Sequence, residues 1–262
     1  RPGMMFSEAG IANSCAITDT EMLDNLRSVQ NRNRLDLTEI LDTKNFSVEM
    51  ETGTGKTYVY LRTIRELHQK YGFLRFVIVV PSVAIREGVL KNLEITREHL
   101  NGLYGAAPYD VIEYNSREIS RLREFALSPN LQILVITIDA FNKPATNVLY
   151  RPADSFDGRR PVEFVQSTRP IVILDEPQNM ESSAASAAIE GLCPLCTLRY
   201  SATHRNLYNL IYRLDPVQAF DLGLVKQIEV SSVLHEGDLA KPFVCLEGFK
   251  VGKKAIAARI TM

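Results

Sequence analysis

The stretch Ser47–Thr57 reads Ser-Val-Glu-Met-Glu-Thr-Gly-Thr-Gly-Lys-Thr, and the interpretation of the whole chain starts from it. The residues up to Met50 predict a strand, the closely spaced Gly53 and Gly55 predict a tight turn, and the residues from Lys56 onward predict a helix. Glycines let backbone amides curl around an anion, and the first turn of a helix adds the positive end of its dipole. The stretch therefore predicts a phosphate-binding loop.

Two side chains at the start of the predicted helix fit this loop chemically. Lys56 can reach the phosphates as a point charge, and the Thr57 hydroxyl can ligate Mg²⁺. The strict form of the pattern has a glycine where Met50 stands, which argues against a generic kinase or GTPase loop. The alternative is an ordinary strand–turn–helix corner with a chance Gly-Lys-Thr, and the strand, the helix and the glycine spacing together disfavour it.

A second polar motif follows a fully apolar run. Ile171–Leu174 predicts a buried strand, and the next residues are Asp-Glu-Pro-Gln, at positions 175 to 178. In an α/β sheet the carboxyl ends of the strands line the ligand crevice, so these carboxylates are expected near the phosphate loop. Asp175 can hold Mg²⁺, and Glu176 can orient or deprotonate a water. Alone, an acidic pair after a strand could simply cap the next helix.

Short apolar runs alternate with amphipathic stretches along most of the chain, which is typical of a parallel sheet covered on both faces. We therefore predict an α/β fold with a doubly wound, mostly parallel sheet and a β-rich C-terminal extension. The predicted strands are Phe46–Met50, Phe76–Val80, Asp110–Tyr114, Ile133–Ile138, Ile171–Leu174 and Thr197–Tyr200. The predicted helices are Lys56–Tyr71, Val83–His99, Ser116–Leu127, Met180–Ile189 and His204–Tyr212.

Three parts of the chain are expected along its length. Residues 1–45 are predicted to hold lead-in helices, residues 46–224 the nucleotide-binding domain, and residues 225–262 the β-rich start of a following segment. Asn142–Pro170, with its prolines, is predicted to be a long surface excursion. Strands in the last part are predicted at Lys226–Val233, Pro242–Phe249 and Ala255–Thr261.

A third motif, Tyr200–Thr203, places small hydroxyl residues after a predicted strand. By itself it would be a helix cap. The phosphate loop, the Asp-Glu-Pro-Gln box and Ser-Ala-Thr, in this order, resemble the first RecA-like domain of superfamily 2 helicases. The chain is most similar to the Res subunit, the motor and nuclease subunit, of type III restriction-modification enzymes. The similarity runs from about Leu23 to Val230, and its residues are Met50–Tyr60, Val79–Ser82, Ile173–Gln178, Tyr200–Thr203, Tyr208–Pro216 and Asp221–Lys226.

The resemblance implies an ATP-dependent DNA motor that couples hydrolysis to translocation or switching before cleavage. It implies ATP bound at the phosphate loop, Mg²⁺ at Thr57 and Asp175, and duplex DNA and a DNA-methyltransferase (modification) subunit as partners. The implied ATP-binding residues are Glu51, Thr52, Gly53, Thr54, Gly55, Lys56 and Thr57. The implied catalytic residues are Lys56, Asp175, Glu176 and Gln178, and the implied coupling residues are Ser201 and Thr203. The segments that would touch the DNA backbone correspond to Pro81, Ser82, Thr137 and Asn142, and Gln30 is the candidate for reading adenine.

Features outside the motifs narrow the expected class. The net charge is −1, so DNA would have to bind through a local basic surface. No run approaches the roughly 20 apolar residues of a membrane span, and the four cysteines do not suggest a disulfide framework, so we expect a cytoplasmic protein without membrane contact. No nuclease pattern is evident, and a second motor domain or nuclease is expected in other sequence.

Three alternatives stay open at this point. Another superfamily 2 DNA helicase, from a repair or CRISPR-associated system, would share all three motifs. An ATP-gated DNA-binding switch would change its ATP affinity with DNA but would not turn over continuously. A small-molecule kinase would need an acceptor pocket, and the Asp-Glu-Pro-Gln box argues against it.

Overall fold

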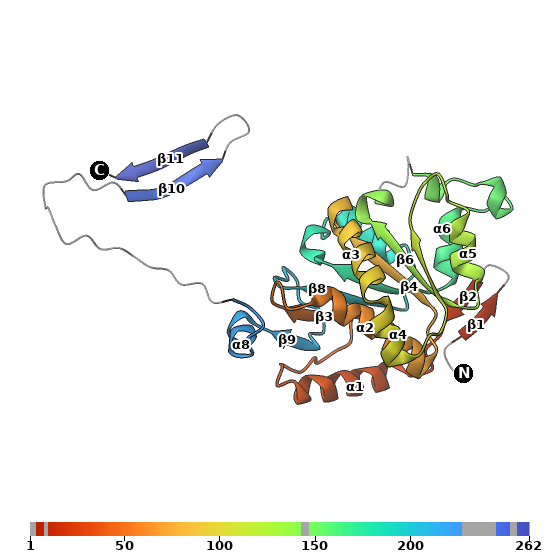
Figure 1. Cartoon of the computed structure of the whole chain (residues 1–262), viewed down its shortest axis with the longest axis horizontal. Helices are drawn as coiled ribbons and strands as arrows, with labels where there is room; N and C mark the ends of the chain where they lie inside the picture. The colour runs from red at the N-terminus through yellow and green to blue at the C-terminus, as the bar shows by residue number, and fades with distance from the viewer. Residues whose placement is uncertain (1–3, 8–9, 143–146, 227–244, 252–255, 262) are drawn as a thin grey trace, which may run out of the picture. The chain divides into compact units, whose positions relative to one another are not determined.

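Seven parallel strands form one sheet in the order β5-β6-β4-β7-β8-β3-β9 (Figure 1). The computed structural model describes the chain except for residues 1–3, 8–9, 143–146, 227–244, 252–255 and 262. The strands are β3 (Asn45–Met50), β4 (Arg75–Val80), β5 (Tyr109–Glu113), β6 (Leu131–Thr137), β7 (Ile171–Asp175), β8 (Cys196–Ser201) and β9 (Tyr212–Leu214). The chain divides into two units, Arg1–Lys226 and Gln227–Met262, and the sheet belongs to the first.

Helices cover both faces of the sheet, because its central strands carry apolar side chains on both faces. In β4, Phe76, Ile78 and Val80 pack into one core cluster, and Val77 and Val79 pack into a second cluster on the opposite face. The first cluster contains side chains of α2 (Lys56–Tyr71), α3 (Val83–Ile95) and α4 (Arg97–Tyr104). The second contains side chains of α5 (Arg121–Leu127), α6 (Pro161–Ser167) and α7 (Ser183–Glu190). The predicted doubly wound α/β fold is therefore confirmed.

The remaining elements flank this sheet. Helix α1 (Asp19–Arg32) begins with a capping box, in which Thr18 and Glu21 satisfy each other's backbone amides. Ahead of it, β1 (Met4–Ser7) and β2 (Gly10–Asn13) form an antiparallel hairpin. Four short 3-10 helices, η1 (Ile138–Ala140), η2 (Val148–Tyr150), η3 (Asp154–Phe156) and η4 (Pro177–Asn179), and α8 (Pro216–Asp221) complete the first unit. Among the described residues, no helix has both the length and the apolar character needed to cross a membrane.

The six strands predicted from the sequence are all present, and most of their ends differ by one or two residues. The helix prediction was less accurate. The helix predicted at Val83–His99 is divided at Thr96 into α3 and α4, and the one predicted from Ser116 begins only at Arg121. The helix predicted at His204–Tyr212 is wrong, because residues 204–211 form an irregular segment with bends that leads into β9.

Two further predictions need correction. The N-terminal part contains one helix and a β-hairpin rather than helices alone. The segment Asn142–Pro170 is not simply a surface excursion, because its apolar side chains are buried against α5 and the sheet. These include Leu149, Phe156, Val162, Phe164 and Val165.

The second unit is described only in part. Strands β10 (Cys245–Val251) and β11 (Ile256–Thr261) pair antiparallel, with a register shift between Leu246 and Gly248. They correspond to the strands predicted at Pro242–Phe249 and Ala255–Thr261. The strand predicted at Lys226–Val233 lies outside the described residues beyond Lys226.

Candidate functional site

The loop Glu51–Gly55 connects β3 to α2 and depends on two glycines with positive φ. Gly53 has φ +81° and Gly55, which precedes the first residue of α2, has φ +90°. A Cβ atom at either position would meet nothing within 4 Å, so backbone conformation rather than space requires glycine. The Thr54 hydroxyl donates to the Glu51 carbonyl at 2.6 Å and closes the turn. The loop therefore has the tight form that the sequence predicted.

Two carboxylates pair with the groups of this loop that would bind phosphate. Lys56 is 9% exposed, and its Nζ lies 3.0 Å from Glu176 Oε1 and 3.5 Å from the Met50 carbonyl oxygen. The Thr52 amide donates to the Glu51 carboxylate at 2.8 Å. An anion that binds the loop has to replace Glu176 as the partner of Lys56. In this structure the loop therefore already pairs with two carboxylates.

The acidic box begins where β7 ends. Asp175 is the last residue of the strand, and Glu176 follows in the left-handed region with φ +57° and ψ +56°. For a residue with a side chain this conformation costs roughly 1–2 kcal/mol, and such strain concentrates at functional sites. The Glu176 amide donates to the Tyr200 carbonyl of the neighbouring β8 at 3.0 Å, which holds the turn in place. The turn brings Glu176 to Lys56, 120 residues earlier in the chain.

The pKa values of the two carboxyl groups shift in opposite directions. Asp175 is 5% exposed, and burial raises its pKa to about 6, with a hydrogen bond from Tyr60 opposing the rise and the nearby Glu176 adding to it. For Glu176, burial also acts to raise the pKa, but hydrogen bonds from Gln178 and Lys56 outweigh it, and the pKa lies below its ordinary value. Lys56 forms its ion pair with Glu176, and its weaker effect on Asp175 does not offset the burial of that carboxyl group.

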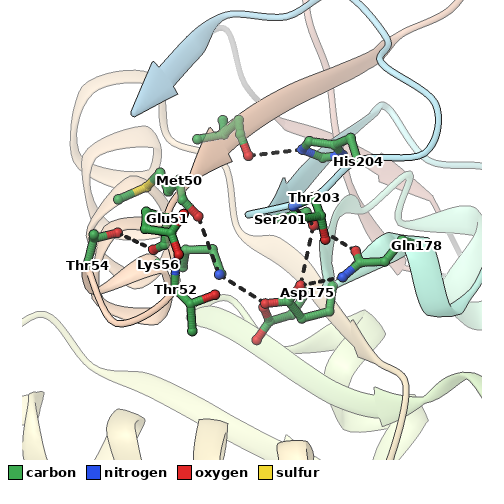
Figure 2. A network of polar contacts seen from close by, with 12 residues as sticks. Met50, Glu51, Thr52, Thr54, Lys56, Asp175, Gln178, Ser201, Thr203 and His204 are labelled. Atoms are coloured by element: carbon green, nitrogen blue, oxygen red, sulfur yellow. Dashed lines mark hydrogen bonds and ion pairs between the residues drawn. The ribbon is translucent and has the colours of Figure 1, made fainter. Parts of the chain in front are cut away.

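A chain of hydrogen bonds joins the acidic box to the end of β8. Gln178 donates to Glu176 Oε2 at 2.7 Å, and the Ser201 hydroxyl donates to Gln178 Oε1 at 2.7 Å. The Thr203 amide in turn donates to Ser201 Oγ at 3.0 Å. Figure 2 shows Lys56, Gln178, Ser201 and Thr203 around one centre, although they come from three separate parts of the chain. Continuous hydrogen bonds therefore connect Glu176 to the end of β8.

The structure brings the other predicted site residues to the same edge of the sheet but not into this network. Pro81 and Ser82 follow β4, where Ser82 caps α3, and Thr137 ends β6 opposite Val80. Asn142 donates to Asp139 at 3.3 Å beyond η1. Their contact with DNA stays a prediction.

Gln30 does not have the freedom that reading adenine would require. Its side chain is 1% exposed, and its amide nitrogen donates to Thr38 Oγ1 at 2.9 Å and to the Leu210 carbonyl at 3.0 Å. Its amide oxygen accepts from the Thr38 backbone at 2.8 Å. These bonds tie α1 to the loop that follows it and to the segment before β9. The side chain thus stabilises the fold.

The sequence interpretation missed two polar contacts, one made by Tyr60 and one made by Arg199. Tyr60 on α2 donates to Asp175 Oδ2 at 3.1 Å, and its position three residues after Thr57, on the same face of the predicted helix, was the available signal. Arg199 on β8 forms a buried ion pair with Glu181 at 2.8 Å. No local sequence pattern predicts this pair. An arginine in an apolar strand is normally interpreted as a surface residue unless a buried acidic partner is known.

Comparison with known proteins gives one family. A family model described as "Type III restriction enzyme, res subunit" matches residues 19–206. The chain is 31% identical over 224 residues to the type III restriction-modification enzyme StyLTI Res subunit of Salmonella typhimurium, which covers 72% of this chain and 23% of that protein. It is 29% identical over 202 residues to the EcoP15I Res subunit of Escherichia coli, covering 69% of this chain and 21% of the relative.

A third relative, the EcoPI Res subunit of Escherichia phage P1, is 28% identical over 236 residues, covering 81% of this chain and 24% of that protein. The chain therefore spans less than a quarter of the length of the curated relatives it matches. Among solved structures, a nuclease-deletion mutant of the Type ISP restriction-modification enzyme LlaGI in complex with a DNA substrate mimic aligns with a TM-score of 0.45 and 12% identity. That alignment covers 80% of this chain and 21% of the other.

Proposed function

Because this chain belongs to the family of type III restriction enzyme Res subunits, we propose that it is the ATP-binding and ATP-hydrolysing domain of a DNA motor. The observation that carries this proposal is the pairing of Lys56 with Glu176 at 3.0 Å. The pair joins the phosphate loop to the acidic box at one edge of the sheet, as a nucleoside triphosphate site requires. The hydrogen bonds from Glu176 through Gln178 to Ser201 extend this site toward β8.

In the proposed site, each part of the loop has a role in ATP binding. The backbone of Thr52–Gly55 and the start of α2 would face the phosphates, and Lys56 would leave Glu176 for them. The Glu51 carboxylate now accepts a hydrogen bond from the Thr52 amide at 2.8 Å, and it would give up this bond when the amide faces the phosphates. Phosphate thus exchanges with two carboxylates, so binding needs no large rearrangement of the loop.

The oxygen groups next to the loop fit Mg²⁺. Thr57 and Asp175 supply a hydroxyl and a carboxylate, the hard ligands that Mg²⁺ prefers alongside phosphate oxygens and water. Asp175 is buried, and burial raises its pKa to about 6, so the carboxylate would gain from a cation beside it. When bound with ATP, Mg²⁺ would neutralise charge that develops on the phosphates.

Once Lys56 has moved to the phosphates, Glu176 is free to act on water. Its carboxylate can then accept a proton or orient an attacking water. Gln178 donates to Glu176 at 2.7 Å, and Ser201 donates to Gln178 at 2.7 Å and to Glu176 at 3.3 Å. These bonds would transmit movement of Glu176 to Thr203 and the segment after β8. These residues are the proposed link between hydrolysis and motion.

We further propose the partners and setting that the names of the relatives suggest. The relatives are Res subunits of restriction-modification enzymes, so duplex DNA and a DNA-methyltransferase subunit are the proposed partners, in the cytoplasm. Pro81, Ser82, Thr137 and Asn142 are the proposed contacts to the DNA backbone. A second motor domain would supply arginines that complete the ATP site, and a nuclease would cut the DNA, both from other sequence.

The test is Mg²⁺-dependent release of phosphate from ATP, measured with and without duplex DNA on this chain and on the full-length gene product. Lys56→Ala should weaken ATP binding at least tenfold, whereas Glu176→Gln should keep binding and abolish turnover. DNA-stimulated turnover in the full-length product supports the motor. ATP affinity that changes with DNA, without sustained turnover, would replace the motor by an ATP-gated switch. Turnover that persists in both variants would refute the assigned site.

A further inference from the structure

The side chain of Tyr60 contacts Asp175, one of the two side chains that are proposed to hold Mg²⁺. It is 0% exposed, and its hydroxyl donates to Asp175 Oδ2 at 3.1 Å. Thr57, the other proposed ligand, lies three residues before Tyr60 on α2 and shares a face of the helix with it.

The direction of this hydrogen bond follows from the chemistry of the groups. The Tyr60 hydroxyl has one hydrogen, and the ionised Asp175 accepts it at Oδ2. The other carboxylate oxygen, Oδ1, is left available to a cation. The bond thus fixes which atom of the carboxylate remains open.

Tyr60 is also held firmly in place. Its ring packs edge-on against the ring of Tyr200, with 5.5 Å between centroids and 61° between planes. A buried tyrosine hydroxyl needs a partner, and packing alone would be served by phenylalanine. The hydroxyl is therefore the feature that ring packing leaves unexplained.

We propose that Tyr60 is a positioning residue that orients Asp175 toward Mg²⁺. The inference rests on the proposed ATP site and adds a residue to it. Tyr60 touches neither ATP nor the metal. It acts through Asp175, by fixing one of the two carboxylate oxygens.

The test compares Tyr60→Phe with Tyr200→Phe in this chain. Both variants remove one buried hydroxyl and keep the ring, but the Tyr200 hydroxyl donates to Thr63 at 3.3 Å, away from Asp175. The affinity for a fluorescent ATP analogue is measured in EDTA and across a Mg²⁺ titration, so the readout is binding and not turnover. Circular dichroism melting of both variants checks the fold.

Tyr60→Phe should raise the Mg²⁺ concentration for half-maximal binding about tenfold, as expected from loss of a hydrogen bond to a charged group. Its affinity in EDTA should stay within about twofold of wild type, and Tyr200→Phe should change neither quantity by more than that. Equal Mg²⁺ requirements in the two variants would overturn the positioning role. If Lys56→Ala binds the analogue as wild type does, the proposed ATP site itself fails, and the inference falls with it.

Discussion

Replacing Asp175 by Asn should stabilise the chain while it removes a proposed Mg²⁺ ligand. Burial raises the pKa of Asp175 from 3.8 to about 6, so the folded state disfavours the ionised carboxylate. At about 1.4 kcal/mol for each pKa unit, this costs about 3 kcal/mol at pH 8 in the absence of metal. Asn is uncharged and close in shape, and it can still accept the Tyr60 hydrogen bond. We therefore expect the variant to gain about 2–3 kcal/mol at pH 8, because the neutral acceptor forms a weaker bond.

The sign of the pH dependence follows from the raised pKa. The stability that Asp175 contributes is fully present below pH 3.8 and is lost as the pH rises through about 6. The advantage of the variant should therefore shrink from about 3 kcal/mol at pH 8 to about half of that at pH 5. Urea unfolding of wild type and variant in EDTA, at both pH values, measures this difference directly.

Asp36→Asn is the matched control, since it makes the same chemical change on an exposed side chain. It should shift the free energy of unfolding by less than about 0.5 kcal/mol at either pH. The reasoning is refuted if Asp175→Asn is no more stable than wild type at pH 8, or if its gain is the same at both pH values.

Three further predictions concern other contacts. Glu176→Gln removes the charge that faces Lys56 at 3.0 Å, so ATP should bind up to about tenfold more tightly in a fluorescence titration, and weaker binding would contradict this. Arg199→Met removes the cation that neutralises the largely buried Glu181 and leaves only the Asn206 amide, at 3.0 Å, as a partner. The variant should lower the free energy of unfolding in urea by about 3 kcal/mol, and a loss below about 1 kcal/mol would mean that the pair is solvated. Gly55→Ala should lower the free energy of unfolding by about 1–2 kcal/mol, because the φ of Gly55 is +90°. Gly88→Ala should raise the free energy of unfolding by about 0.5–1 kcal/mol, because Gly88 lies inside α3 and no atom lies within 4 Å of the new Cβ. A change of the same sign in both variants would refute the backbone argument.

The central sheet was predictable because its strands are apolar on both faces. Strand β4, for example, is buried at all six positions, and after Arg75 its residues Phe76–Val80 form an unbroken apolar run that predicts a buried strand. Strand β9 was missed because it has only three residues and is held by tertiary contacts. The Ile211 amide donates to the Ser47 carbonyl at 2.9 Å, and the Tyr208 amide donates to Ser47 Oγ at 3.0 Å. Such contacts override the local pattern that suggested a helix.

The prediction of a surface excursion at Asn142–Pro170 was wrong for a different reason. Its prolines and the Asp-Gly-Arg-Arg run indicate turns, and turns do occur there, but Pro161 begins α6, where proline is well tolerated at the first helical position. The apolar residues of α6 then pack on α5. Composition alone could not separate a surface loop from a short helix that follows one.

At the site, the sequence located the loop and the acidic box, because both are local patterns at strand ends. It could not show that Glu176 pairs with Lys56, since 120 residues separate them and only the sheet order brings them together. The hydrogen bond from Tyr60 to Asp175, across 115 residues, was hidden for the same reason. The roles of these residues in catalysis stay predictions until they are measured.

The measurement that tests the central claim most directly is the equilibrium dissociation constant of this chain for ATP with Mg²⁺, for wild type and Lys56→Ala. The account predicts saturable binding by wild type that Lys56→Ala weakens at least tenfold, because Lys56 would leave Glu176 for the phosphates. Equal affinity in the two proteins, or no binding by wild type at millimolar ATP, would contradict the claim that Glu51–Thr57 is the phosphate site.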